Sequence, residues 1–226
     1  MAGLSMRFRA WKKRLHDRNC VDFSTPENAA RARFYMRWLD HEVVRIYWTN
    51  LYQIAPGVWR SNHPTEQRFR DMPGMGITTV LNLRGALPRP YYWREVALCQ
   101  ELGLRLIDLP MSGSSAPERA TLVALIETFR SLTTPFVMHC KSGADRTGLA
   151  SAIYLLVILG RPLAEARAML SAKYIHFDTK RAGILDELLR CYDEAHARSA
   201  IGFEDWVREV YDPAEVTARH LERYRK

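Results

Sequence analysis

The sequence lacks paired cysteines. Its four cysteines are scattered along the chain, and none forms a CxxC pair: Cys20, Cys99, Cys140 and Cys191. This spacing argues against a zinc site and against a disulfide framework, and it favours a reducing compartment. We therefore expect no bound metal, and we expect the cysteines to remain thiols.

Long apolar runs and targeting signals are also absent. The longest mainly apolar run, Leu149 to Leu159, is too short to cross a bilayer and predicts a buried helix. The N-terminal residues show no apolar core followed by a small-residue cleavage site, so no secretory signal is expected. These absences favour a cytoplasmic protein, with peripheral contact at the inner face of a membrane as the alternative that the charge distribution raises.

Positive charge is concentrated at the start of the chain. The net charge is +8, and residues 1–18, with six cations against one acid, carry +5 of it. The other 208 residues share the remaining +3. A nucleic-acid-binding protein more often spreads its cations over a folded face with interleaved aromatic residues. Nucleic acid is therefore not an expected partner.

Apolar residues recur at helical spacing within this basic segment: Leu4, Phe8, Trp11 and Leu15. Residues 4–15 therefore predict a short basic amphipathic helix. Three interpretations stay open: a helix packed on the body of the protein, a helix lying on an anionic membrane, and a frayed tail or transit peptide. A second helical stretch, from Pro26 to about Val44, has nearly balanced charges and predicts a packing helix.

From residue 51 the pattern alternates between short apolar segments and helical segments. Five segments predict strands: 51–54, 57–61, 77–83, 104–109 and 136–139. Helices are predicted at 65–72, 91–102, 116–132, 147–159, 163–170, 180–198 and 203–224. The alternation predicts an α/β fold with a central, mostly parallel sheet flanked by helices on both faces.

The length of 226 residues favours one main domain with appended elements. We expect a helical extension over residues 1–48, a main domain over residues 49–198, and a C-terminal helix over residues 199–226 that packs on it.

The chemistry is carried by the segment VMHCKSGADRTG, residues 137–148, which follows the last predicted strand. A loop between a strand and a helix can point successive backbone N–H groups into one concavity, which binds a tetrahedral anion. Gly143 permits the sharp turn, and the planar fork of Arg146 can clamp two phosphate oxygens. The expected phosphate-binding residues are Lys141, Ser142, Gly143, Ala144, Asp145 and Arg146.

Cys140 opens this loop beside the N-terminus of the following helix. The helix dipole and the nearby cations favour the thiolate, so the pKa of this thiol should lie well below its usual value of ~8.5. Such a thiolate is a nucleophile that needs no separate base, and its attack on a phosphate ester would form a cysteinyl-phosphate that water hydrolyses. We expect Thr147 to donate its hydroxyl to the departing sulfur, and His139 to orient the loop through hydrogen bonds.

The segment HCKSGADRTG resembles the C-x5-R signature loop of the protein tyrosine and dual-specificity phosphatase superfamily. The likeness extends upstream, because PGVWRSNHPTEQRFRDMPGMGITTVLNLRG is similar to the opening of small bacterial and fungal dual-specificity-type phosphatases. It covers roughly residues 50–195 and leaves both ends outside. The resemblance implies a largely parallel sheet flanked by helices, and no metal or organic cofactor.

The general acid departs from the pattern of that superfamily. In dual-specificity phosphatases an aspartate lies on a loop about thirty residues before the cysteine, where it can protonate the leaving group. The matching loop here, MSGSSA at residues 111–116, contains no carboxylate. Asp145 is the preferred candidate, because myotubularin-type lipid phosphatases and some bacterial inositol phosphatases have an aspartate at this place in the loop. Asp108, Glu118, and water or the substrate itself are the alternatives.

Three functions of different kinds stay open. The upstream resemblance favours a tyrosine or dual-specificity protein phosphatase. Lys141, Asp145 and the basic N-terminal helix support a phospholipid phosphatase, acting on a phosphoinositide or phosphatidylglycerophosphate at a membrane surface. The third is a non-catalytic phosphate-binding module. The expected partner is accordingly a phosphorylated protein or a phospholipid.

Overall fold

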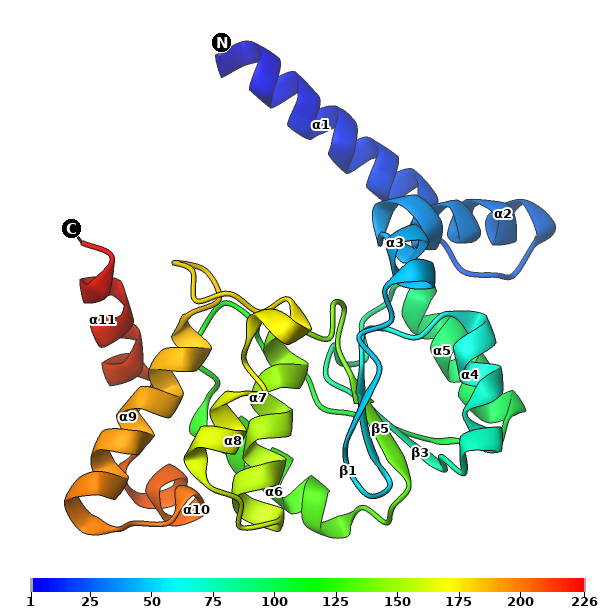
Figure 1. Cartoon of the computed structure of the whole chain (residues 1–226). Helices are drawn as coiled ribbons and strands as arrows, with labels where there is room; N and C mark the ends of the chain where they lie inside the picture. The colour runs from blue at the N-terminus through cyan, green and yellow to red at the C-terminus, as the bar shows by residue number, and fades with distance from the viewer. Residues whose placement is uncertain (1, 226) are drawn as a thin grey trace.

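The computed structural model describes the backbone of residues 2–225 and the side chains of residues 9–225 (Figure 1). A five-stranded sheet lies at its centre. Its strands are β1 (Tyr52–Ala55), β2 (Val58–Ser61), β3 (Thr79–Asn82), β4 (Arg105–Asp108) and β5 (Phe136–His139). Their order across the sheet is β1-β2-β5-β3-β4; β1 pairs antiparallel with β2, and the other three pairs are parallel. The predicted α/β fold with a mostly parallel central sheet is confirmed.

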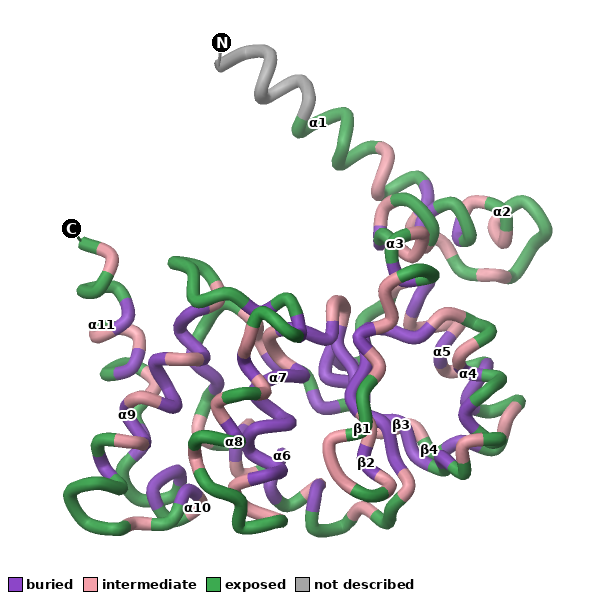
Figure 2. Tube along the Cα trace, in the orientation of Figure 1, coloured by how far each residue is buried: buried purple, intermediate pink, exposed green. Residues whose placement is uncertain are grey.

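Helices cover both faces of this sheet (Figure 1). One face is covered by α4 (Glu66–Asp71) and α5 (Pro90–Glu101). The other is covered by α6 (Arg119–Ser131) and α7 (Asp145–Ile153), and α8 (Leu163–Arg167) and α9 (Ile184–Ser199) pack farther from the sheet. All four residues of β5 are buried, because it is the central strand with a layer of helices on either side (Figure 2).

The N-terminal segment folds into α1 (Ala2–Asn19), α2 (Pro26–Phe34), the π-helical η1 (Tyr35–Leu39) and α3 (Glu42–Tyr47). Thr25 begins α2 by accepting a hydrogen bond at Oγ1 from the backbone N–H of Asn28, 3.1 Å away. The prediction of one helix from Pro26 to Val44 is wrong in one respect. The first helical run ends at Leu39, and His41 adopts a left-handed backbone with φ of 64°, which re-aims α3.

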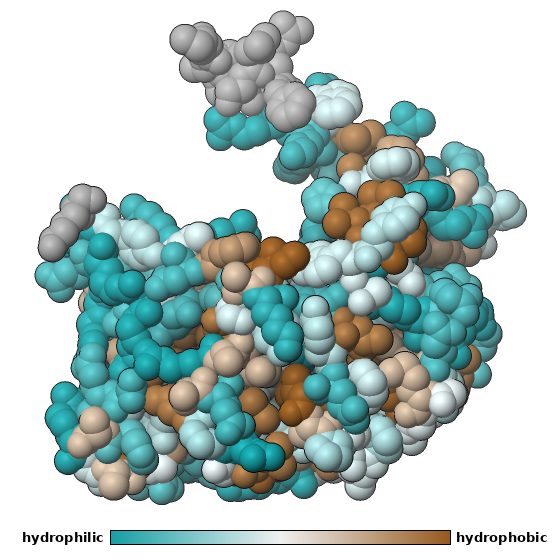
Figure 3. Space-filling model, in the orientation of Figure 1, coloured by the Kyte–Doolittle hydropathy of each residue, from teal (hydrophilic) through white to brown (hydrophobic). Residues whose placement is uncertain are grey.

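The predicted basic helix corresponds to α1, although the side chains of Leu4 and Phe8 lie outside the described residues. Residues 9–14 are exposed, and Trp11 is 52% exposed. The described part of α1 stands clear of the body of the molecule (Figures 1 and 3). Its last turns hold it in place, where the Tyr35 hydroxyl lies 2.7 Å from Nε2 of His16. A helix packed along the body is therefore not what residues 9–14 form.

The C-terminal segment is broken where one helix over 203–224 is predicted. It consists of α10 (Phe203–Asp205), the π-helical η5 (Trp206–Val210) and α11 (Pro213–Arg223). Asp212 begins α11 by accepting a hydrogen bond from the backbone N–H of Ala214, and Pro213 takes the first helical position. The Tyr211 hydroxyl donates to the backbone carbonyl of Pro117 at 2.6 Å, which attaches this segment to the body.

Within residues 2–225, no helix combines the length and the apolar character that a membrane span requires.

Candidate active site

The phosphate-binding loop predicted from the sequence connects β5 to α7. Cys140 follows the last residue of β5, and Asp145 is the first residue of α7. Cys140 is 1% exposed, and its sulfur accepts a hydrogen bond from the backbone N–H of Gly143 at 3.2 Å. The loop therefore curls around the sulfur atom and directs at least one amide toward it.

The surroundings of Cys140 favour the thiolate. Burial alone would raise the pKa of this thiol, because it disfavours the charged form. The positive charge of Arg146, the hydroxyl and backbone N–H of Thr147, and the amide of Gly143 outweigh burial and lower the pKa below its ordinary value. The other buried cysteines behave oppositely, since burial raises the pKa of Cys99 to about 12 and that of Cys191 to about 11.

Gly143 is required at its position in the loop. Its φ is 73°, and a Cβ atom there would lie 2.7 Å from the backbone nitrogen of Asn62. Arg60 fixes the same turn from β2 by donating to the carbonyl of Gly143 at 2.6 Å. The Asn50 amide donates to the carbonyl of Ser142 at 3.1 Å. The loop is thus held in shape by residues that precede and follow β1.

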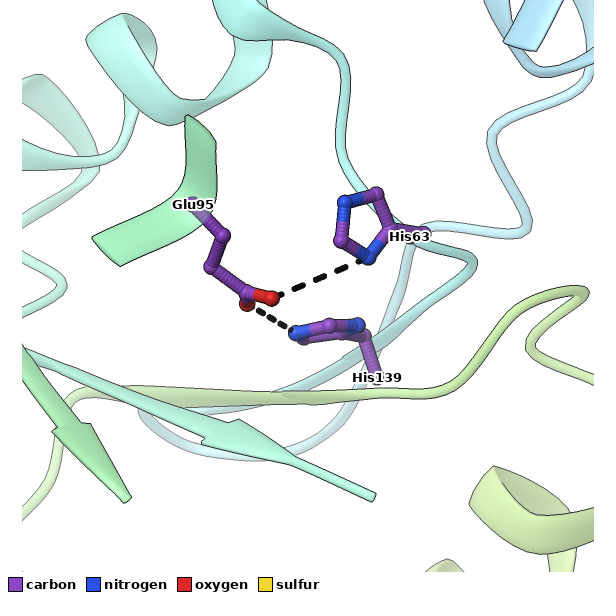
Figure 4. Close-up of side chains that lie close together, drawn as sticks. All are labelled: His63, Glu95 and His139. Carbon is purple, nitrogen blue, oxygen red and sulfur yellow. Dashed lines mark hydrogen bonds and ion pairs between the residues drawn. The ribbon is translucent and has the colours of Figure 1, made fainter. Parts of the chain in front are cut away.

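His139, the last residue of β5, supports the loop from the face of the sheet that α5 covers. Its Nε2 lies 2.6 Å from Oε1 of Glu95, and its Nδ1 lies 3.4 Å from the carbonyl of Cys140. Glu95 also faces His63, whose Nδ1 lies 3.9 Å from Oε2 (Figure 4). All three side chains are buried. This arrangement agrees with the orienting role expected of His139.

Among residues 9–225, these three side chains form the one group of His, Cys, Asp or Glu residues that could hold a metal ion. Their ligand atoms lie within 4.8 Å of one another, and two imidazoles with a carboxylate suit a transition metal. However, burial and the positive charge of neighbouring groups, Arg84 first among them, lower the pKa of His63 well below its usual value. The positive potential that opposes a proton there also opposes a cation. We therefore interpret this cluster as a hydrogen-bonded support for His139.

A cavity of about 430 Å³ opens beside the loop, and we refer to it as the active-site cavity. From the phosphate-binding loop it is lined by Lys141, Ser142, Asp145 and Arg146. Its other walls come from three segments: His41, Val44, Arg45 and Trp48; Gly113 and Ser114; and Thr179, Arg181 and Ala182. His41 and Val44 belong to the stretch that the sequence predicts as a packing helix, and the structure places them in a wall of the cavity.

Asp40 connects this N-terminal wall to the loop. Its carboxylate is buried and accepts from Arg84 at 2.7 and 3.0 Å and from Arg45 at 3.0 Å, and it lies 3.5 Å from Nζ of Lys141. Burial raises the pKa of Asp40, but the charges and hydrogen bonds of these cations lower it below its usual value overall. Asp40 is therefore a carboxylate that anchors three cations, of which Arg45 and Lys141 line the cavity.

Asp145, the preferred acid, lies at the cavity with one oxygen already engaged. Its Oδ1 is 2.8 Å from Nδ1 of His176, and Nε2 of His176 is 2.8 Å from Oδ2 of Asp186. Burial lowers the pKa of His176, but hydrogen bonds to the two carboxylates raise it to about 9. His176 is therefore an imidazolium at neutral pH, and neither it nor Asp186 was expected from a sequence motif.

The two alternative acids lie elsewhere. Asp108 accepts from the Asn82 amide at 2.7 Å and from the Tyr92 hydroxyl at 2.6 Å, so both of its oxygens have structural partners. Glu118 is exposed and occupies the N-cap position of α6, where its side chain makes no capping hydrogen bond. Neither side chain lines the active-site cavity.

A strand, a C-x5-R loop around a thiolate-favouring cysteine, and a helix on a mainly parallel sheet define the class of cysteine-based phosphatases. Residues 54–182 match the family described as PTP-SAK: Swiss Army Knife protein, DSP-PTPase phosphatase domain. The chain belongs to this family. The matched region contains the loop but not the N-terminal wall of the cavity.

Two curated relatives carry related names. The inositol diphosphatase DSP2 of Oryza sativa subsp. japonica is 26% identical over 128 residues, which cover 54% of this chain and 61% of DSP2. The dual specificity protein phosphatase TpbA of Pseudomonas aeruginosa strain UCBPP-PA14 is 28% identical over 112 residues, covering 49% of this chain and 48% of TpbA. The chain thus spans less than two thirds of the length of either relative.

Solved structures share the fold. The core catalytic domain of the PP-IP phosphatase SIW14 from S. cerevisiae superimposes with a TM-score of 0.52 at 17% identity, covering 67% of this chain and 90% of that domain. The structure named Tk-PTP in the active form gives a TM-score of 0.50 at 20% identity, covering 63% of this chain and 97% of that one.

Proposed function

We propose that this protein is a cysteine-dependent phosphatase that hydrolyses phosphate monoesters through a cysteinyl-phosphate intermediate. The observation that carries the proposal is Cys140, a thiol with a lowered pKa at the base of a loop that opens into a cation-lined cavity. Family membership supports the same chemistry.

In the proposed first step, the Cys140 thiolate attacks phosphorus while the bond to the leaving oxygen breaks. Arg146 and the loop amides stabilise the charge on the equatorial oxygens, and Asp145 protonates the leaving oxygen. In the second step, water attacks the phosphorus atom and the sulfur departs. Thr147, whose hydroxyl and amide already lower the pKa of Cys140, stabilises that departing thiolate.

The preferred substrate is a phosphorylated protein, of the tyrosine or dual-specificity type. The description of the family and the name of TpbA support this choice. A second candidate is a phosphorylated inositol or phospholipid. It is supported by the name of DSP2 and by the cations around the cavity, which suit a substrate with more than one phosphate group: Arg45, Lys141, Arg146 and Arg181.

We further propose that α1 makes peripheral contact with an anionic membrane. Its exposed residues 9–14 include four cations and Trp11, and such a helix binds lipid through an apolar anchor and charge attraction. A membrane contact would favour the lipid substrate over the protein substrate.

The nucleophile is tested by substitution. Cys140→Ser should abolish turnover of an aryl phosphate, while inorganic phosphate should still bind because Arg146 and the loop amides remain. Cys191→Ser is the matched control, since this buried thiol has a raised pKa and lies away from the cavity on α9. Substantial turnover by Cys140→Ser, measured as phosphate release, would contradict the proposed mechanism.

The substrate is tested by measuring phosphate release from a phosphotyrosine peptide, soluble inositol phosphates, phosphoinositides and phosphatidylglycerophosphate. A higher kcat/KM on the peptide than on the other esters would support the protein substrate. A preference for the inositol or lipid esters would transfer the proposal to the second candidate.

A further inference from the structure

His176 lies beside Asp145 but takes no part in the two steps of the proposed mechanism. It follows the 3-10 turn η4 (Ala172–Tyr174) and the left-handed residue Ile175, and its backbone N–H donates to the carbonyl of Ser171 at 3.1 Å. This turn sends the imidazole inward, where it is 2% exposed. The turn thus places a titratable side chain directly behind Asp145.

The imidazole lies between two carboxylates from different helices. Nδ1 faces Asp145 at the start of α7, and Nε2 faces Asp186 in the first turn of α9, each at 2.8 Å. These are the charged groups of α7 and α9 that contact it, and η4 approaches it through backbone. Two acceptors at hydrogen-bond distance require a donor at both ring nitrogens, which is the protonated form of histidine.

Asp145 has a second oxygen that this pairing leaves available. Within residues 9–225, Oδ2 of Asp145 has no hydrogen-bond partner, and it lies on the side of Gly113, another residue that lines the cavity. The Asp145 side chain is 33% exposed. One face of this carboxyl group thus meets a proton donor in the protein, while the other meets the space that a phosphate ester would enter.

We propose that His176, held by Asp186, is the proton reservoir that supplies Asp145 during catalysis. The inference rests on the proposed function. In the first step, the proton moves from Nδ1 of His176 to Asp145. Rotation of the protonated carboxyl group about its Cβ–Cγ bond, a torsion with broad two-fold preferences, turns the O–H toward the substrate. The leaving oxygen accepts this proton as its bond to phosphorus breaks and the bond between sulfur and phosphorus forms.

The second step returns the proton. The hydroxide part of an attacking water bonds to phosphorus as the phosphorus–sulfur bond breaks, which restores the Cys140 thiolate and releases phosphate. The proton of that water passes to Asp145 and back to Nδ1 of His176. No proton is gained or lost by the enzyme over the cycle. The relay accounts for an acid in a chain whose 111–116 loop has no carboxylate.

The relay predicts a dependence on the leaving group. Phenyl phosphate needs a proton on its leaving oxygen, whereas dinitrophenyl phosphate does not, because its leaving group is stable as an anion. His176→Gln and Asp145→Asn should each lower kcat on phenyl phosphate by about 10²-fold and change kcat on dinitrophenyl phosphate by less than about threefold. The double variant should lose little more than either single variant, because both residues act on one proton.

A matched control is His196→Gln, which alters an exposed histidine of α9 that contacts the carbonyl of Ile201 and lies away from the cavity. It should leave both rates unchanged. Equal losses on the two esters in His176→Gln would show a merely structural role and would overturn the relay. That outcome is distinct from failure of the proposed function, in which the wild-type protein would hydrolyse neither ester.

The pH dependence of kcat and the NMR titration of His176 distinguish a proton reservoir from a merely structural residue. For the wild-type protein, kcat on phenyl phosphate should fall as pH rises through about 9, where His176 loses its proton. Asp186→Asn should move this fall to lower pH, because one of the two carboxylates that favour the imidazolium is removed. In NMR spectra, the pH at which the ring resonances of His176 titrate should be lower in Asp186→Asn than in the wild-type protein by the same amount. A profile that Asp186→Asn leaves unchanged would contradict the reservoir role.

Discussion

Cys140 and Arg146 begin and end the C-x5-R loop, and the chemistry of the cysteine depends on the arginine. The charge of Arg146 is the main influence that opposes burial and keeps the Cys140 thiol at a lowered pKa. The cysteine needs the arginine before substrate arrives, and the proposed transition state needs it again as charge moves onto the equatorial oxygens. A lysine in place of Arg146 distinguishes these two effects, because it has the same charge but a different shape.

Arg146→Lys keeps the charge but loses the planar fork that can bind two oxygens at once. We expect kcat to fall by more than KM rises, because the two-pronged contact strengthens in the transition state. Steady-state kinetics on an aryl phosphate measure both constants. A rise in KM alone would mean that Arg146 binds substrate and transition state equally, contrary to its proposed role.

The segment from α2 to α3 differs most from what the sequence predicts. It lies before the matched family region, yet it supplies His41, Val44, Arg45 and Trp48 to the active-site cavity. The left-handed backbone of His41 turns α3 toward the loop, and Asp40 attaches that turn to Arg84 and Lys141. Figure 3 shows apolar side chains gathered over this part of the molecule, where Val44, Ile46 and Tyr47 are exposed.

Asp40→Asn should destabilise the protein and weaken phosphate binding together. Removing one partner of a buried ion pair leaves uncompensated charge and costs about 3–5 kcal/mol. The cations Arg45 and Lys141 would also lose the anchor that holds them at the cavity. Urea denaturation measures the stability, and titration with inorganic phosphate measures the affinity.

Asp71→Asn is the control for that experiment, because Asp71 is an exposed carboxylate of α4 that accepts from Gln67. It should change neither quantity. Wild-type stability and phosphate affinity in Asp40→Asn would show that the N-terminal wall is held by other contacts.

On the scale of the whole molecule, α1 projects a basic helix away from a body that is only mildly charged. Deleting residues 1–18 should remove binding to anionic vesicles and reduce activity on a lipid substrate. Activity on a soluble ester should stay the same, because residues 9–18, the part of this segment whose side chains the structure describes, do not line the cavity. Co-sedimentation with vesicles measures the binding, and uncharged vesicles are the control.

Salt provides a second check on the membrane contact. Attraction between exposed charges is screened over about 10 Å at 0.1 M salt, so binding to anionic vesicles should weaken as salt increases. An intact protein that ignores anionic vesicles at low salt would remove the main support for the membrane proposal, and a phosphoprotein substrate would be strengthened.

The amino-acid sequence by itself determined the strands, the sheet class and the place of the C-x5-R loop between β5 and α7. Strands and helices follow from local periodicity, and the residues from Cys140 to Arg146 are contiguous, so their roles can be inferred without knowing what surrounds them. The sequence did not predict the interruptions between helices at Asp40–His41 and at Tyr211–Pro213. A single residue with an unusual backbone or a cap hardly alters the periodicity of a long helical segment.

Only the tertiary structure decided what surrounds the loop. Asp40 and Arg84 are 44 residues apart, and Asp145 and His176 are 31 apart, so no local pattern connects them. Their interactions depend on how α3 turns and on where η4 directs His176. In both cases a buried charge required partners of the opposite charge, and folding supplied those partners from distant segments. The acid candidate Asp145 was visible as a residue of the loop, whereas the imidazolium behind it was visible only in the folded molecule.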